Sequence, residues 1–403
     1  MNRKQFLILM LALVVLGGAG LALFWQDIAA YRSTGAKIGA RLLPDLKLSE
    51  VAQVHLRDAT HEATLTHKEN RWVVQERADY PASYADISDM LIRLTELKVV
   101  QSEAIGASLL PRVGLAPPGR PAQGENKAAE SHKAAEQPAE NDQAAEKPAA
   151  KAASEGTGTL IEMKNASGKT LATLTLGKVV LKKDPGNPLP SAQNGVPAGR
   201  YVQVGGAQTV AVVSDPLNKI EADPGHWLDK TFFKADRIRT LTVAGSGGSW
   251  KITRDEEWGQ WKFVSGGGEL DASAAVAAVN ALNNLAFTDV AVKPEGEAGE
   301  KAVSVTAETF DQLVYTFKIS ERKGGGYLLN GNVEGEPAQQ RAPEKDEKPQ
   351  DKERRDKEYA ETLKKLTERI TRERALAKWT YVVDAKIVGP LFKDRADLAA
   401  PKK

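Results

Sequence analysis

Apolar and polar residues alternate along two separate stretches of the chain, residues 51–76 and 238–265. This alternation predicts three short, half-buried antiparallel strands in each stretch. Polar turns separate the strands, and the last strand of each set contains a tryptophan, Trp72 in the first and Trp261 in the second. The recurrence of the whole plan indicates that one β unit is duplicated.

An amphipathic helix is predicted after each set of strands. Ser83 precedes the first helix and has Asp86 three residues later, a weak capping box, and Asp271 is the expected N-cap of the second. Apolar residues at spacings of three and four then form one face of each helix. These are Ile87, Met90, Leu91, Leu94 and Leu97 in the first copy, and Ala275, Ala278, Val279, Leu282 and Leu285 in the second.

Further strands follow each predicted helix. They are 159–164, 171–176, 178–181, 201–204 and 210–213 in the first copy, and 303–307, 312–319, 327–330, 380–383 and 387–388 in the second, with 327–330 taken as the counterpart of 178–181. We expect both copies to be interrupted at the same hairpin tip, by a Pro/Gly/Asn-rich loop in the first and by a long excursion in the second. The predicted fold class is α+β, with two tandem repeats of an antiparallel sheet packed with one helix.

Two polar insertions interrupt these repeats. Residues 117–156 consist mainly of Ala, Glu, Lys and Pro, and the segment lacks the apolar surface needed to offset its ordering entropy, so it is predicted to be disordered. Residues 334–378 form the second insertion. Its first part is polar and flexible, whereas 351–378 are densely charged with opposite charges four residues apart, which favours a projecting helix.

An apolar seam runs along this charged helix. Its members are spaced 4-3-4, as in about two heptads of a coiled coil. One interpretation is that the seam lies against its own domain, and the other is that it docks on a partner helix. The candidate partner-binding residues are Tyr359, Leu363, Leu366 and Ile370.

The N-terminus carries a basic start followed by an uncharged apolar run, residues 6–25, which is about the length that crosses a bilayer. Trp25 lies where an interfacial aromatic is expected, and Arg3 and Lys4 favour a cytoplasmic N-terminus. We therefore predict an uncleaved transmembrane anchor, with a cleaved signal peptide as the alternative. The predicted domains are the anchor with its short cytoplasmic tail (1–28), a first repeat (45–235) and a second repeat (236–395).

Composition excludes several classes of function. The net charge of the 403-residue chain is +2, which provides no overall electrostatic footprint for nucleic acid, so no nucleic-acid partner is predicted. Cysteine is absent, which excludes disulfides, thiolate metal sites and cysteine nucleophiles. The chain length suits two or three domains with real cores.

No catalytic, cofactor-binding or metal-binding residue is predicted. The clustered histidines are His55, His61 and His67, but a hairpin turning near 58–62 places His55 opposite about residue 65 and leaves His61 at the tip, so three ligands do not converge. The carboxylate pairs do not stand out from the charge background, and the glycine runs lack nucleotide-binding spacing. Because Trp72 and Trp261 recur at one position, a shared core role is predicted for both, whereas Trp258 is the hairpin tryptophan expected to be exposed.

Residues 220–233 lie between the two copies and include the run Asp-Pro-Gly-His-Trp-Leu-Asp-Lys-Thr-Phe. We expect a hinge here, with Trp227, Leu228, Phe232 and Phe233 sealing the junction of the two units. This run, the single span and the duplicated unit resemble the bacterial domain of unknown function 4340 family. The resemblance covers roughly residues 45–390, apart from the two insertions.

That resemblance implies an inner-membrane protein that faces outward, often encoded beside the ATPase and permease of an ABC transporter and a gliding-motility-type auxiliary subunit. The family has no established catalytic residues to transfer. The predicted function is therefore a non-enzymatic periplasmic accessory or scaffold protein, anchored by residues 6–25 and bound to transporter subunits. The alternative is a cell-envelope enzyme or glycan-binding protein that uses the cleft between the repeats. A soluble substrate-binding protein is disfavoured because its βαβ alternation is missing.

Overall fold

The computed structural model divides into two compact units, unit 1 ending at Trp227 and unit 2 beginning at Leu228. The sequence prediction put the boundary between residues 235 and 236. The predicted anchor at 6–25 and nearly all of the insertion 117–156 lie outside the described residues. Within the part of the chain that is described, no helix is both long and apolar enough to cross a bilayer. The described residues are 38–119, 156–182, 195–207, 209–245, 248–341 and 347–400.

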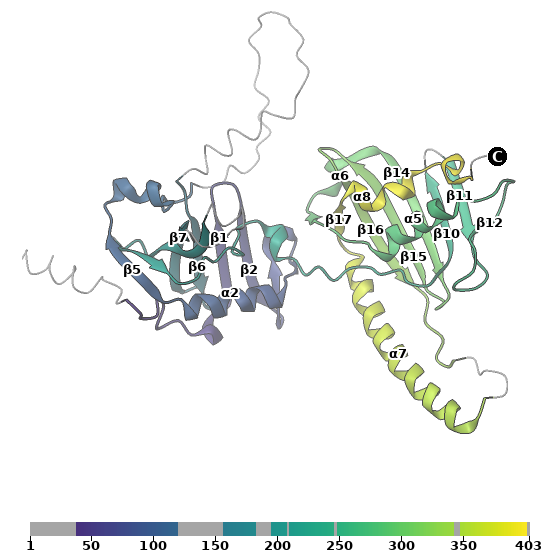
Figure 1. Ribbon diagram of the computed structural model, residues 1–403, viewed down its shortest axis with the longest axis horizontal. Helices are drawn as coiled ribbons and strands as arrows, with labels where there is room; N and C mark the ends of the chain where they lie inside the picture. The colour runs from purple at the N-terminus through teal and green to yellow at the C-terminus, as the bar shows by residue number, and fades with distance from the viewer. Residues whose placement is uncertain are drawn as a thin grey trace, which may run out of the picture. The chain divides into compact units, whose positions relative to one another are not determined.

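Unit 1 contains one antiparallel sheet of nine strands, in the order β4-β3-β2-β1-β6-β7-β8-β9-β5 (Figure 1). Helix α2 (Tyr84–Glu96) lies against this sheet and buries Ile87, Met90, Leu91 and Leu94. The strands are β1 (Gln53–Arg57), β2 (Glu62–Lys68), β3 (Arg71–Val74), β4 (Tyr80–Pro81), β5 (Val99–Ala104), β6 (Thr159–Lys164), β7 (Thr170–Lys182), β8 (Val196–Val204) and β9 (Thr209–Val213).

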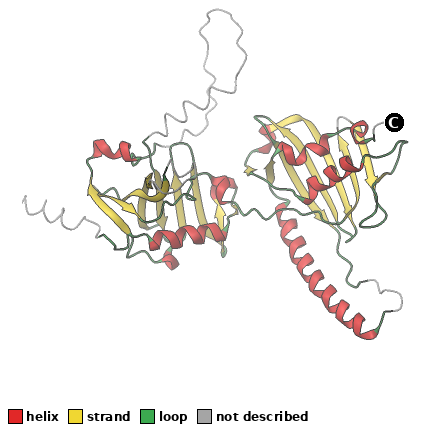
Figure 2. Ribbon diagram, viewed as in Figure 1, coloured by secondary structure: helices red, strands yellow, loops and turns green. Residues whose placement is uncertain are grey.

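Unit 2 contains an antiparallel sheet of eight strands, in the order β12-β11-β10-β14-β15-β16-β17-β13. Figure 2 shows strands in yellow and helices in red. Its helices are α5 (Ala272–Asn283), the single turns α6 (Pro294–Glu297) and α8 (Ala385–Val388), and the long α7 (Pro349–Leu376). The strands are β10 (Ile238–Gly245), β11 (Gly248–Thr253), β12 (Lys262–Phe263), β13 (Asp289–Ala291), β14 (Ala298–Thr309), β15 (Val314–Arg322), β16 (Tyr327–Glu334) and β17 (Thr380–Val383).

The two sheets repeat one strand order. Apart from the two-residue edge strand β4, each strand of unit 1 has a counterpart at the same place in unit 2, from β3 and β12 at one side to β5 and β13 at the other. The main helix also has an equivalent place in the chain: α2 lies between β4 and β5, and α5 lies between β12 and β13. The predicted α+β class with antiparallel sheets and few helices is confirmed.

The register repeats as well as the order. Trp72 and Trp261 each lie two residues before an apolar residue that is paired across the ladder. Those pairs are Val74 with Leu65, and Phe263 with Ile252. The neighbour of each ring is also equivalent, because His67 contacts Trp72 edge-on at 5.5 Å and the Arg254 guanidinium lies 4.8 Å from the Trp261 ring centroid. Trp72 is buried and Trp261 is half-buried, so the shared core role predicted for both is met fully only by Trp72.

One equivalent cross-strand pair differs in the sizes of its two side chains between the units. In unit 1, Leu174 lies opposite Val204, and in unit 2 the same place holds Phe317 opposite Gly331. A Cβ at Gly331 would lie 2.7 Å from the Phe317 ring, so glycine makes room for the larger aromatic. Unit 2 therefore packs an aromatic core where unit 1 packs an aliphatic one.

In each unit a return segment follows the last strand, residues 214–227 in unit 1 and 384–398 in unit 2. Each return segment ends in a 3-10 turn, Pro224–Trp227 and Arg395–Leu398 respectively. The last carbonyl of each turn accepts a hydrogen bond from the N-cap residue of the main helix. The bonds are Ser83 N–H to Trp227 O at 2.8 Å and Asp271 N–H to Leu398 O at 2.9 Å. Both N-caps are as predicted, since the Ser83 and Asp271 side chains accept from backbone N–H groups three residues on.

The residues predicted to seal the junction together instead pack in separate units. Trp227 is buried in unit 1, where its indole N–H donates to the Glu221 carbonyl at 2.8 Å. Phe232 and Phe233 pack in unit 2 against Tyr381, with ring centroids 4.6 and 6.5 Å apart. Residues 220–233 thus contain the end of unit 1 and the start of unit 2. Trp227 completes the core of unit 1, and Phe232 and Phe233 complete the core of unit 2.

The prediction that both copies are interrupted at the same hairpin tip is wrong. In unit 1 the long connection joins β7 to β8, whereas in unit 2 the excursion with α7 joins β16 to β17. The counterpart of β16 is β8, which reaches β9 through a short connection only. The predicted strand 387–388 is instead part of helix α8, because Asp384 caps a helical turn there.

Candidate functional site: the projecting helix α7

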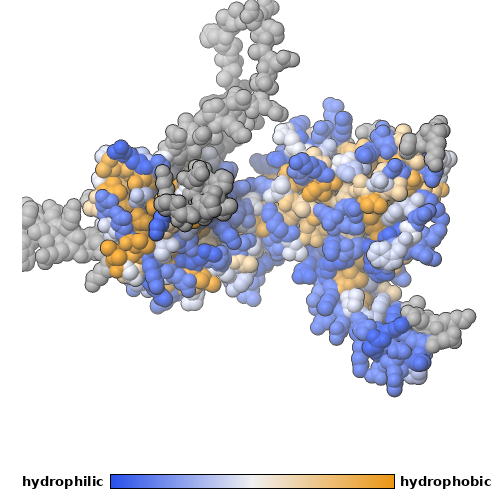
Figure 3. Space-filling view, viewed as in Figure 1, coloured by the Kyte–Doolittle hydropathy of each residue, from blue (hydrophilic) through white to orange (hydrophobic). Residues whose placement is uncertain are grey.

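Helix α7 is the largest feature of unit 2 without a counterpart in unit 1. Its 28 residues span about 42 Å, and Figure 1 shows it extending away from the sheet. Pro349 occupies the first turn, where its missing N–H is harmless. Side chains four residues apart form ion pairs on its surface, including Lys357 with Glu353 at 2.8 Å. The extended part is almost entirely hydrophilic in Figure 3.

The C-terminal end of α7 is packed into unit 2. Ile370, Leu376 and the following Trp379 are all buried. Asn330 on β16 donates from its amide nitrogen to the carbonyls of Ala377 at 3.0 Å and Trp379 at 2.8 Å, which satisfies acceptors at the helix end. The base of the helix is therefore tied to the sheet by apolar packing and by hydrogen bonds.

A buried carboxylate also ties the base of α7 to the sheet. Glu373 is 1% exposed, and its oxygens accept hydrogen bonds from the Tyr315 hydroxyl at 2.8 Å and the Lys234 N–H at 3.1 Å. Burial raises the pKa of Glu373, although the Tyr315 hydrogen bond and the Arg369 charge oppose this rise. Burial and then the charge of Glu373 also raise the pKa of Tyr315. The helix thus carries a carboxyl group deep into the core, where β15 and the segment before β10 supply its hydrogen bonds.

Arg369 completes this anchor one turn earlier on the helix. Its guanidinium donates to Asp236 at 2.9 Å and lies 3.5 Å from Glu373. Asp236 and Lys234 belong to the segment that leads into β10, so α7 is held both by the sheet and by the start of unit 2. Because these groups are buried or half-buried, their ion pairs are less screened than those of the exposed helix surface.

The predicted seam is divided in the structure. Ile370 is buried at the base of the helix, and the Tyr359 hydroxyl donates to the Ala338 carbonyl at 2.6 Å. Leu363 and Leu366, between these two, are half-buried. The ends of the seam are therefore held by unit 2 itself, and its middle remains partly open.

A groove of about 460 Å³ lies beside this open part of the seam. It is formed between α7, including Tyr359 and Leu363, and residues 339–341 of the segment that connects β16 to α7. Arg341 of that segment binds Glu347 at 2.6 Å and Asp356 at 2.8 Å. The pair with Asp356 joins the connecting segment to α7 beside the groove, and the pair with Glu347 links two parts of that segment.

Sequence reasoning missed Glu373, although a signal was present. The seam spacing of 4-3-4 ends at Ile370, and the next interval of three leads to Glu373. In a sequence, a charged residue at the next seam position is normally interpreted as the end of the apolar seam. Here the seam continues into the core, with a carboxylate in place of a leucine.

The three histidines do not meet, as the hairpin geometry predicted. His55 lies opposite Thr64, one residue from the expected partner, and its Nε2 is 2.6 Å from Glu62. His61 is at the turn beside Asp58, and His67 contacts Trp72. Across the described residues, no three side chains of the metal-binding types are grouped to hold an ion.

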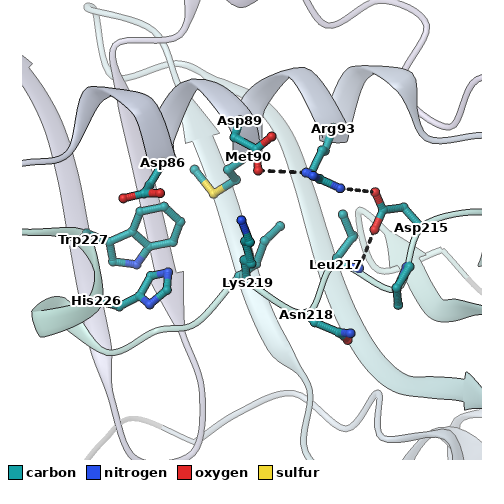
Figure 4. Close-up of a pocket in the computed structure, with 12 residues that line it drawn as sticks. Asp86, Asp89, Met90, Arg93, Asp215, Leu217, Asn218, Lys219, His226 and Trp227 are labelled. Carbon is teal, nitrogen blue, oxygen red and sulfur yellow. Dashed lines mark hydrogen bonds and ion pairs between the residues drawn. The ribbon is translucent and has the colours of Figure 1, made fainter. Parts of the chain in front are cut away.

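A small cleft of about 190 Å³ lies in unit 1, between α2 and the return segment (Figure 4). Its floor is apolar and includes Met90 and Trp227. On its rim Arg93 binds Asp89 at 2.8 Å and Asp215 at 2.9 Å. Because both carboxylates bind the same guanidinium, the arrangement ties the helix to the return segment and leaves neither one as a free acid or base.

Comparison with known proteins gives a family match over part of the chain. Neither a curated protein nor a solved structure matches the chain. Residues 191–304 match the family described as Domain of unknown function (DUF4340). This stretch includes the end of unit 1 with Trp227, and the first strands and the main helix of unit 2. The match agrees with the resemblance found in the junction, which lies within these residues.

Proposed function

We propose that this chain is a non-enzymatic accessory protein that docks on a membrane partner through helix α7. Residues 6–25 would anchor it in the bacterial inner membrane, with both units on the periplasmic side, beside an ABC-type transport system. The resemblance to the family supports the location and the class of partner. The projecting helix supports the docking role, and it is the observation on which the proposal rests.

Helix α7 is rigidly held, and the duplicated fold of unit 1 lacks it. Unit 1 closes the equivalent hairpin with a short turn, so this fold does not need an excursion of this length. Unit 2 nevertheless holds the base of α7 with Glu373, Arg369 and Asn330. A helix that is already ordered loses little conformational entropy when a partner binds it. Docking of a helix face into a groove is a common mode of protein recognition.

Leu363 and Leu366 are the proposed contact residues. They are half-buried and lie on one face of α7, whereas exposed charged residues cover the opposite face. Burial of two leucines by a partner would contribute a few kcal/mol, since full burial of one such side chain is worth roughly 1.5–3 kcal/mol. The surrounding charges would fix the register and favour one partner over others.

Co-purification from native membranes tests the proposal. The full-length tagged chain is extracted in mild detergent, and the transporter ATPase and permease recovered with it are quantified by mass spectrometry. The test variant is Leu363→Asp with Leu366→Asp. The control is Lys365→Asp, which lies about 200° around the helix from Leu363 and changes the net charge by the same amount.

We expect the leucine variant to lose the transporter subunits and the lysine variant to retain them, while both keep the helical signal of the parent in circular dichroism. Equal recovery with the leucine variant would refute docking through this face. Equal loss with both variants would show that charge, and not the apolar seam, determines binding.

A further inference from the structure

Trp258 is exposed to an unusual degree for a tryptophan. Its relative exposure is 91%, whereas tryptophan is highly buried on average. It lies in the loop between β11 and β12. In unit 1 the equivalent strands β2 and β3 are joined by Glu69 and Asn70 alone, both with positive φ, as in a tight two-residue hairpin turn. The fold therefore closes this hairpin without a longer loop, and the exposed indole is an addition specific to unit 2.

The loop that carries Trp258 is braced on both sides. Glu257 receives two hydrogen bonds from the Arg237 guanidinium, at 3.0 and 2.9 Å. Asp255 binds Lys262 at 2.6 Å across the hairpin. Arg254 donates to the Ile238 carbonyl at 2.8 Å. Such bracing fixes the backbone around a side chain that itself contacts little, and an anchor held in this way loses little entropy on binding.

Among the three acidic residues before Trp258, Asp255 is paired with Lys262 and Glu257 with Arg237, which leaves Glu256 as the carboxylate without an ion pair in the described structure. Asp255 is largely exposed, Glu256 is exposed, and Glu257 is half-buried. An exposed carboxylate such as that of Glu256 is repelled by anionic lipid headgroups, so an indole beside it is poorly placed to insert into a membrane surface. It is complementary to an apolar pocket whose rim carries lysine or arginine. Tryptophan is also the residue type enriched among the dominant contacts of protein interfaces.

The Trp258 loop and helix α7 share one support. The segment that leads into β10 binds Glu373 through the Lys234 N–H, and Arg369 through Asp236. The next residue, Arg237, binds the Trp258 loop through Glu257. Four consecutive residues therefore hold the base of the helix and the loop in one rigid body of unit 2.

We propose that Trp258 is the anchor of a second protein contact, inserted into an apolar pocket with a cationic rim on the partner that α7 binds. The inference rests on the proposed function in so far as the partner is a protein. It adds a second contact point and states the chemistry of the surface that receives it.

Photo-crosslinking in native membranes tests this contact. A photoreactive amino acid replaces Trp258 in the full chain, and in a second variant it replaces Val276, which is 48% exposed on α5. The crosslinked peptides are identified by mass spectrometry. We expect position 258, but not position 276, to crosslink to one protein, at a peptide with lysine or arginine beside apolar residues. Products with lipid or envelope glycan only, or equal yields at both positions, would overturn the proposal.

Substitutions at the rim and at the anchor provide a second test. With the probe at position 258, Glu256→Lys should lower the crosslinking yield several-fold, and Glu300→Lys, an equal charge change at another exposed site, should not. Trp258→Ala should weaken retention of the partner by about 30-fold, the loss for a dominant interface residue. It should leave the thermal unfolding temperature unchanged. Retention that is unaffected by Trp258→Ala, or a yield unaffected by Glu256→Lys, contradicts the proposal.

The two proposals fail in different ways. If the Leu363/Leu366 variant loses the transporter subunits while position 258 crosslinks to no protein, only the Trp258 contact is wrong. If position 258 crosslinks to a cationic pocket and the leucine variant still retains that partner, the docking role of α7 is wrong and the Trp258 contact stands.

Discussion

Replacement of Glu373 tests whether the buried network holds helix α7. Glu373→Ala removes the acceptor of the Tyr315 hydroxyl and the Lys234 N–H and leaves Arg369 with one carboxylate partner fewer. Removal of one partner from a buried charged network costs about 3–5 kcal/mol, because the remaining groups stay desolvated without a partner. For a unit of this size that corresponds to a fall of roughly 6–20 °C in the melting temperature.

Glu373→Gln separates the shape of the side chain from its charge. A glutamine oxygen can accept from the Lys234 N–H, and its amide can donate to the Tyr315 oxygen. We therefore expect a change within about 1 kcal/mol near neutral pH. Because burial raises the pKa of Glu373, the proton is bound more tightly in the folded state than in the unfolded chain.

The stability that Glu373 contributes is expected to decrease as the pH rises. The stability of the parent relative to Glu373→Gln is highest below the ordinary glutamate pKa, and it falls as the pH rises through the raised pKa of the folded state. The assay is differential scanning calorimetry of the full chain from pH 4 to 8, with hydrogen exchange of the α7 amides. If Glu373→Ala leaves both the unit 2 transition and the exchange of α7 unchanged, the network does not anchor the helix.

Four further substitutions test the fold. Ser83→Ala and Asp271→Ala remove equivalent N-caps and should each cost about 1 kcal/mol, in the transition of unit 1 and of unit 2 respectively, in urea denaturation. An effect on the other unit's transition would contradict this. Gly331→Ala places a methyl group 2.7 Å from Phe317 and should destabilise unit 2 by about 1–3 kcal/mol by the same assay, and a neutral result would show that the aromatic core is loosely packed. Trp227→Ala should lower the stability of unit 1 by about 3–5 kcal/mol in calorimetry and leave the unit 2 transition in place, whereas a loss in unit 2 would mean that Trp227 supports both units.

Local patterns predicted the repeated parts of the fold well. The caps Ser83 and Asp271 and the apolar face of α2 depend on near neighbours in sequence, so periodicity finds them. The counterpart of Trp72 could also be found, because the apolar residue two positions after each tryptophan keeps the same cross-strand register, although the loop before Trp261 is longer.

The errors arose where pairing depends on distant residues. The strand that starts at Tyr327 was matched with residues 178–181, which are the end of β7, whereas its counterpart is β8. The connection before β16 is short and the connection before β8 is long, which hides the equivalence in the sequence. The candidate seam was predicted in full, but only the structure shows that its ends are held by Ala338 and by the core around Ile370. Glu373 was missed because a buried carboxylate in a charge-rich helix has the same local sequence as an exposed one.

The absence of cysteine permits the most direct test of docking through α7. Single cysteines are placed at 363 and 366 on the seam and at 361, 365 and 368 on the opposite face. Each is labelled with a membrane-impermeant maleimide, in intact native membranes and in the purified chain. Docking predicts that the two seam positions react more slowly in the membranes than in the purified protein, while the opposite face reacts equally in both. Equal rates at the seam positions in the two preparations would contradict the account.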